Sequence, residues 1–92
     1  MHTKLQGNYP NPFNPETTIS YSVNDPSVVK IEIYNIKGQK VKTLVNELKQ
    51  RGMHSVVWNG NDEDNRSVSS GIYFYKLHSG HITDVQKMVL MK

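Results

Sequence analysis

The residues that could do chemistry are concentrated in one polar stretch, residues 59–65. Its candidate calcium ligands are Asn59, Asn61, Asp62 and Asp64, because Ca²⁺ prefers oxygen ligands. The spacing departs from the EF-hand pattern, since the sixth position counted from Asn59 is Asp64 instead of glycine and the twelfth is Ser70 instead of glutamate. We therefore expect a solvated loop whose side chains bond its own backbone, with calcium as the less favoured alternative.

Other reactive side chains are too scattered to form an active site. His78 and His81 could approach each other across a turn, but zinc would need further ligands and the chain has no cysteine. Ser69 and Ser70 precede Gly71 without the Gly-x-Ser-x-Gly elbow that exposes a serine nucleophile. The sequence therefore predicts a protein that is not an enzyme, with no catalytic residue, and with no metal or cofactor other than the calcium alternative.

Length and composition predict one small domain. The chain has 92 residues and a formal net charge of +3, from 11 basic and 8 acidic residues. The lysines are spread along the chain, which does not favour a nucleic-acid partner, and no apolar run is long enough for direct membrane insertion. The start lacks the apolar stretch of a signal peptide. We expect residues 5–92 to form the domain, residues 1–4 to be a remnant of expression, and another segment to direct export.

Alternating apolar and polar residues predict a series of short strands. The expected strands are residues 17–23, 29–34, 40–44, 54–58, 71–77 and 82–91. The stretch 71–77 is apolar on both faces, which is typical of a central strand. Residues 45–51 are few and end at Gly52, so we expect a loop there. The prolines of residues 10–15 predict an extended or turning segment.

Short strands separated by turns, without a convincing helix, predict an all-β fold. We expect an immunoglobulin-like antiparallel β-sandwich of about seven short strands. It would have no disulfide, because the chain has no cysteine. Trp58 would then be a core aromatic that lacks the disulfide on which the tryptophan of antibody domains packs.

Three motifs and the end of the chain carry a family resemblance. The motifs are Asn8–Ile19 (NYPNPFNPETTI), Tyr34–Val41 (YNIKGQKV) and Ser70–Tyr75 (SGIYFY), followed by the ending Lys87–Lys92 (KMVLMK). In this order they resemble the type A C-terminal sorting domains of proteins that Bacteroidota-like bacteria export through the type IX secretion system. The resemblance runs from about Leu5 to Lys92. The pattern is also similar to the immunoglobulin-like domain of the flagellar hook-capping protein.

The resemblance implies a function and partners. A domain of this kind ends a larger secreted cargo protein, to which it is covalently fused. The type IX secretion machinery recognises it at the outer membrane, and a sortase-like peptidase removes it as the cargo is released or anchored to surface lipopolysaccharide. The cargo would therefore be secreted or lie at the cell surface, after transit through the periplasm.

We expect eight residues to contribute to partner recognition. They are Pro10, Asn11, Pro12, Gly38, Gly71, Tyr73, Lys87 and Lys92. Prolines reduce the entropy cost of ordering an extended segment for a partner, although the same segment could simply protect a sheet edge. The long terminal strand could accept a partner strand, with Lys87 and Lys92 beside it, or its lysines could only keep that edge soluble. Gly38 and Gly71 also suit tight turns.

Two other functions remain open from sequence alone. A carbohydrate-binding or adhesive module would use exposed aromatics such as Tyr9, Phe13 or Tyr34 as a planar row of sugar-stacking rings. A structural spacer domain would show neither ligand affinity nor dependence on the terminal strand. Dimerisation through that strand is a further alternative.

Overall fold

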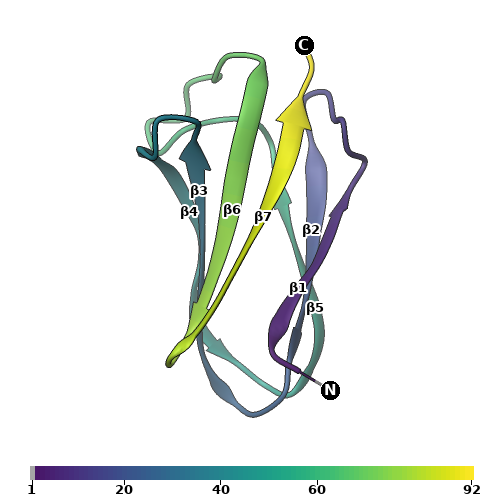
Figure 1. Cartoon of the computed structure of the whole chain (residues 1–92), viewed down its shortest axis with the longest axis vertical. Helices are drawn as coiled ribbons and strands as arrows, with labels where there is room; N and C mark the ends of the chain where they lie inside the picture. Colours follow the sequence, from purple (N-terminus) through teal and green to yellow (C-terminus); the bar gives the residue numbers. More distant parts are fainter. Residues whose placement is uncertain (1) are drawn as a thin grey trace.

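Seven β-strands form two antiparallel sheets in the computed structural model, which describes residues 2–92 (Figure 1). The three-stranded sheet has the order β1 (Lys4–Tyr9), β2 (Thr17–Val23), β5 (Gly52–Trp58). The four-stranded sheet has the order β4 (Lys40–Lys49), β3 (Ser27–Asn35), β6 (Gly71–Ser79), β7 (Ile82–Leu90). The predicted all-β sandwich is confirmed. Within residues 2–92 there is no helix of the length and hydropathy needed to cross a bilayer.

Alternate residues of the strands build the core between the two sheets. The inward-facing set is buried, with Ile19, Tyr21 and Val23 from β2, Val29, Ile31 and Ile33 from β3, and Tyr73, Tyr75 and Leu77 from β6. β6 lies between β3 and β7, so its predicted central position is confirmed. Trp58 is fully buried, as expected for a core aromatic.

The sequence did not predict the first strand, β1. A bulge between Leu5 and Gly7 interrupts its pairing with β2, so the period-two pattern is too short to recognise. Leu5 is buried in the core, and the Thr3 hydroxyl accepts the backbone N–H of Asn24 at 2.8 Å. Residues 2–4 are therefore structured against the sandwich, and Met1 lies outside the described residues.

The predicted loop over residues 45–51 is wrong for most of its length. β4 continues to Lys49 and pairs there with the first half of β3. A bulge opposite Ile31 and Glu32 shifts the register, so the alternation that starts at Lys40 does not continue. Tertiary pairing with β3, not local pattern, determines the length of this strand.

Tyr73 forms a tyrosine corner at the start of β6. Its hydroxyl donates a 2.6 Å hydrogen bond to the backbone carbonyl of Ser69, four residues upstream. Its ring packs edge-on against Trp58, with ring centroids 5.3 Å apart. This contact fixes the loop that enters β6 to the core, as the corresponding tyrosine does in other immunoglobulin-like sandwiches.

Gly60 is required by a close backbone approach. Its φ of +78° lies in the left-handed region, and a Cβ atom there would stand 2.9 Å from the carbonyl oxygen of Pro15. Gly38 has a similar φ of +81°, but a Cβ atom would meet nothing within 4 Å. Both positions therefore favour glycine because φ is positive, and only at Gly60 would a side chain also clash with a neighbouring backbone atom.

Removing the corner hydroxyl should destabilise the domain without altering its core. We expect Tyr73→Phe to lower the free energy of unfolding by about 1 kcal/mol, because one hydrogen bond is lost and the ring contact is kept. Urea denaturation measures this loss. Tyr9→Phe is the control, because Tyr9 is 82% exposed and should change stability little. Equal stability of the two variants would contradict the structural role of the Tyr73 hydroxyl.

Alanine should cost more at Gly60 than at Gly38. Both substitutions place a side chain at positive φ, which costs roughly 1–2 kcal/mol. Gly60→Ala must also displace the Pro15 carbonyl, and overpacking typically adds about 1–3 kcal/mol. Thermal or urea unfolding of the two variants measures the difference directly. If both lose the same stability, the close approach of Gly60 to Pro15 is not a real constraint.

Candidate recognition surface

The three sequence motifs come together at one end of the sandwich (Figure 1). Residues 10–16 connect β1 to β2, residues 36–39 connect β3 to β4, and residues 59–70 connect β5 to β6. β7 also ends here, so the C-terminus joins them, whereas the described chain begins at the opposite end. We call this surface, made of residues 10–16, 35–39, 59–71 and 91–92, the motif end.

Asn35 shapes the hairpin at the motif end. Its side-chain oxygen accepts the backbone N–H groups of Lys37 at 2.9 Å and Gln39 at 3.0 Å. Gly38 supplies the positive φ, and its N–H donates to the Asn35 carbonyl at 2.9 Å. Asn35 was not among the predicted site residues, although an asparagine three positions before a glycine is a recognised turn signal. The motif therefore encodes a rigid turn.

The proline segment, residues 10–15, is bound to the end of β7. Phe13 donates its N–H to the Val89 carbonyl at 3.0 Å and accepts the N–H of Met91 at 2.8 Å, which makes a parallel bridge. The Asn11 side-chain oxygen accepts the N–H of Val89 at 3.0 Å. The Phe13 ring is buried and lies 5.6 Å from the Trp58 ring. The segment therefore holds the C-terminus in place.

This contact limits the terminal strand as a template for a partner strand. β7 lies at a sheet edge, as predicted. However, its outward-facing backbone groups at Val89 and Met91 already bond the proline segment. Farther back, the Asp84 carboxylate accepts the N–H of Leu5 at 2.9 Å, so β1 also lies against this edge. At the C-terminal end of β7 the proline segment therefore occupies the backbone groups that a partner strand would need.

The eight predicted recognition residues divide into three groups. Exposed positions are Pro10, Asn11, Pro12, Gly38, Lys87 and Lys92. Gly71 is half-buried, and Tyr73 is only 6% exposed, so Tyr73 supports the motif end from the core instead of presenting its ring.

The two predicted lysines lie on different surfaces. The Lys92 N–H donates to the Ser70 hydroxyl at 3.0 Å, and its ammonium contacts the Ser67 hydroxyl, so Lys92 belongs to the motif end. Lys87 stands opposite Phe74 on the outer face of the four-stranded sheet. The two lysines therefore do not flank one docking surface.

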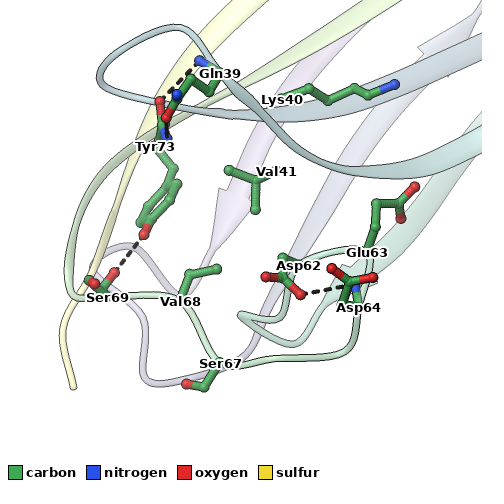
Figure 2. Close-up of a pocket in the computed structure, with 11 residues that line it drawn as sticks. Gln39, Lys40, Val41, Asp62, Glu63, Asp64, Ser67, Val68, Ser69 and Tyr73 are labelled. Carbon is green, nitrogen blue, oxygen red and sulfur yellow. Dashed lines mark hydrogen bonds between the residues drawn. The ribbon is translucent and has the colours of Figure 1, made fainter.

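A polar hollow of about 600 Å³ opens between the start of β4 and the loop 59–70 (Figure 2). Gln39, Lys40 and Val41 form one wall, and Asp62, Glu63 and Ser67 lie across from them. The Glu63 N–H donates to the Val41 carbonyl at 3.1 Å, which attaches the loop to β4. Tyr73 also lines the hollow, and burial raises its pKa, so its hydroxyl stays protonated and acts as a hydrogen-bond donor.

The candidate calcium ligands bond the loop that carries them. The Asp62 side chain accepts the N–H group of Asp64 at 3.0 Å (Figure 2). It also accepts the N–H group of Arg66 at 2.9 Å. The Asn59 side chain accepts the N–H of Asn61 at 3.2 Å, and the Asn61 amide donates to Asn65 at 3.0 Å. In the part of the chain that the structure describes, no three His, Asp or Glu side chains gather as they would around a metal.

The aromatic row required of a sugar-binding module does not form. Tyr9 is 82% exposed, but Phe13 is 2% exposed and packs in the core, so its predicted exposure is wrong. Tyr34 is half-buried on the outer face of the four-stranded sheet, where the Lys76 ammonium covers its ring. With Phe13 buried and the Tyr34 ring covered, these three residues do not form an exposed row on which a sugar chain could stack.

Solved structures of several bacterial proteins contain the same fold. PorZ of Porphyromonas gingivalis, a surface component of the type IX secretion system, matches with 18% identity and a TM-score of 0.68, over 94% of this chain and 11% of its own. Latent PorU of the same bacterium matches with 16% identity and a TM-score of 0.82, over 97% of this chain and 9% of its own. FlgD of P. aeruginosa matches with 20% identity and a TM-score of 0.66, over 80% and 60%. At these identities the likeness shows the fold alone, and this chain spans about a tenth of PorZ and PorU.

Comparison with known sequences shows the family to which the chain belongs. No curated protein matches it closely. The family of secretion system C-terminal sorting domains, however, matches residues 8–91, which include all three motifs and most of the C-terminal ending. This match confirms the resemblance that the motifs indicated, and with it a sorting function for cargo that leaves the cell. The chain belongs to the family of secretion system C-terminal sorting domains.

Proposed function

We propose that the domain is a sorting signal that works in its folded state, and that the type IX secretion machinery binds its motif end at the outer membrane. One observation carries this proposal: the three motifs and the C-terminus lie side by side on one end of the sandwich (Figure 1). The motifs are far apart in sequence, so only the folded domain presents them together. A partner that binds the motif end would therefore select cargo whose sorting domain has folded.

The motif end is largely pre-organised for binding. Asn35 holds the hairpin, Tyr73 holds the loop before β6, and Phe13 holds the end of β7. A surface ordered before binding loses less conformational entropy on association, which favours affinity. Exposed residues such as Pro12 and Lys92 would then contact the machinery, while the buried residues position them.

The fold separates the proposed cargo from the motif end. The described chain begins at the opposite end of the sandwich from Lys92 (Figure 1). A cargo domain fused before Thr3 would leave the motif end accessible. A sortase-like peptidase would cut most readily in the segment that precedes β1, because residues from Lys4 onward are paired with β2.

We further propose that the domain acts by being bound, without catalysis, cofactor or nucleic-acid partner. The Asx side chains of the loop 59–65 are engaged with their own backbone, which supports a loop that holds its shape without calcium. Tyr73 donates its hydroxyl proton to a hydrogen bond and is not activated as a base, since burial raises its pKa.

Export of a reporter tests the role of the motif end. The chain is fused behind a fluorescent protein that carries an inner-membrane export signal, in a type IX-competent bacterium. We expect the Pro12→Ser/Lys92→Glu variant to lower extracellular fluorescence about tenfold, because two contacts with the secretion machinery are lost. A tenfold loss corresponds to about 1.4 kcal/mol of binding free energy. The matched control, Pro26→Ser/Lys4→Glu, changes the same residue types at the opposite end and should be exported normally.

Deletion of residues 87–92 would be a poor test, because it removes Met88 and Leu90, which are 0% and 1% exposed in the core. Proteolysis of the purified variants establishes that both remain folded. Equal export of the two double variants would overturn the role of the motif end. Normal export of the reporter without the domain, or from a secretion mutant, would overturn the sorting proposal as a whole.

A further inference from the structure

The outer face of the four-stranded sheet carries a cluster of lysines. The strand register places four of them on this face: Lys30, Lys40, Lys76 and Lys87. We call this set the cationic face. Glu32 is the one carboxylate that the register of the four described strands places among them. Four positive charges and one negative charge leave a local net charge of +3.

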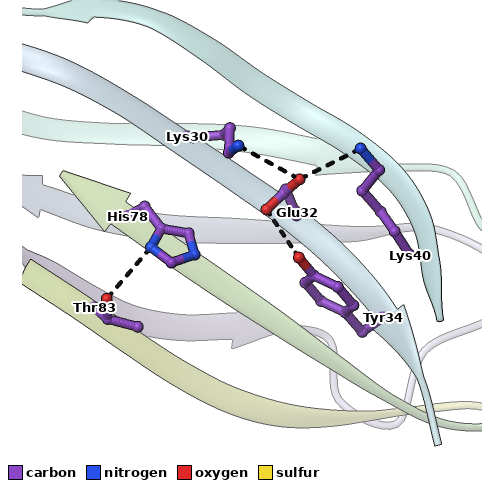
Figure 3. A network of polar contacts seen from close by, with 6 residues as sticks. All are labelled: Lys30, Glu32, Tyr34, Lys40, His78 and Thr83. Atoms are coloured by element: carbon purple, nitrogen blue, oxygen red, sulfur yellow. Dashed lines mark hydrogen bonds and ion pairs between the residues drawn. The ribbon is translucent and has the colours of Figure 1, made fainter. Parts of the chain in front are cut away.

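Glu32 organises the cluster without neutralising it. Its side chain is 6% exposed, accepts the Tyr34 hydroxyl at 2.9 Å, and lies 3.8 Å from the Lys30 ammonium and 3.6 Å from that of Lys40 (Figure 3). Burial alone would raise the pKa of Glu32, but the Tyr34 hydrogen bond and the two lysines together lower it, so the group is ionised. Both ion pairs are long and both lysines are about half exposed, so their charges remain accessible to a partner.

An apolar groove lies beside the cationic face. It has a volume of about 290 Å³, and Tyr34, Ile36, Phe74 and Val85 form its apolar walls. Ile36 is 69% exposed and Val85 is 49% exposed. The Lys76 ammonium lies 5.1 Å from the centre of the Tyr34 ring, so one lysine of the cluster is held against the groove. Apolar contact and positive charge are therefore adjacent.

The charges indicate what kind of partner fits this face. A second copy would bring the same lysines and be repelled. Every cation of the face is lysine, a point charge that pairs with single anionic groups. The apolar groove beside these lysines fits a partner that offers apolar side chains next to its carboxylates, as an acidic protein segment does and free phosphate does not. Arg51 and Arg66, the two arginines of the chain, lie in loops outside the four strands of this sheet.

We propose that the cationic face binds an acidic segment of a partner protein, whose carboxylates meet Lys76 and Lys87 while one apolar side chain enters the groove of Tyr34, Phe74 and Val85. The site is distinct from the proposed contacts of Pro12 and Lys92 with the secretion machinery. It does not use those two residues: Lys76 and Lys87 lie on the sheet face, and the groove meets the motif end only at the hairpin, where Ile36 forms one of its walls.

Calorimetric titration of the whole chain tests this site. The probe is a synthetic peptide of about nine residues that alternates glutamate with leucine and has a central phenylalanine, long enough to cross the sheet. We expect Lys76→Glu to weaken binding about five- to tenfold, and Lys4→Glu, the matched control on the other sheet, to leave it within about twofold. Raising NaCl from about 0.05 M to about 0.5 M should also weaken binding, because the attraction is screened.

A second variant keeps the test decisive if Lys76→Glu fails to fold. Val85→Asp changes an exposed side chain, places a negative charge in the groove, and should weaken the same peptide by a similar factor. The proposal is overturned if the wild-type chain does not bind the peptide, or if Lys76→Glu and Lys4→Glu bind it equally.

Three other kinds of partner for the cationic face would each give a different experimental result. Competition by inorganic phosphate or a thymidine oligonucleotide would identify a phosphate site. Lys76-dependent binding to phosphatidylcholine vesicles that contain phosphatidylglycerol, without peptide binding, would identify a lipid surface. A dimer seen in sedimentation and lost in Lys76→Glu would identify self-association. Each of these three outcomes would replace the acidic protein segment as the occupant.

Discussion

The contact between Phe13 and the end of β7 holds the motif end of this domain together. Two backbone hydrogen bonds join Phe13 to β7, and its buried ring packs on Trp58. Trp58 in turn contacts Tyr73, whose hydroxyl fixes the loop before β6. Three aromatic side chains from three separate segments thus form one cluster. Because each ring buries a large apolar area, this cluster stabilises loops that have few regular backbone bonds of their own.

The interior, the motif end and the outer sheet face of the sandwich carry different kinds of residues. The space between the sheets holds the apolar residues and gives a small, cysteine-free chain its stability. The motif end presents turns and loops whose shape is set by local hydrogen bonds. The outer face of the four-stranded sheet presents lysines around one buried carboxylate, Glu32. In the proposed role, in which the domain acts by being bound, each of these surfaces can serve a different contact.

The motifs of this chain combine residues that shape the fold with residues that are exposed on its surface. The glycine of the hairpin and the asparagine before it make a turn that other residues form poorly. Phe13 and Tyr73 lie within two of the motifs and are buried, so their rings are not presented to a partner. Exposed prolines beside them belong to the same segments, so structural and recognition residues are interleaved along the chain. Motif membership alone does not separate the two roles.

The sequence by itself determined the strand-rich fold, the buried faces of β2, β3 and β6, and the family, because period-two alternation and turn residues are local signals. It did not determine β1 or the second half of β4, where bulges interrupt the alternation. Only the tertiary structure showed that Phe13 is buried, that the end of β7 is covered, and that Lys30, Lys40, Lys76 and Lys87 share one face. Those features depend on pairing between segments far apart in sequence, which no local pattern encodes.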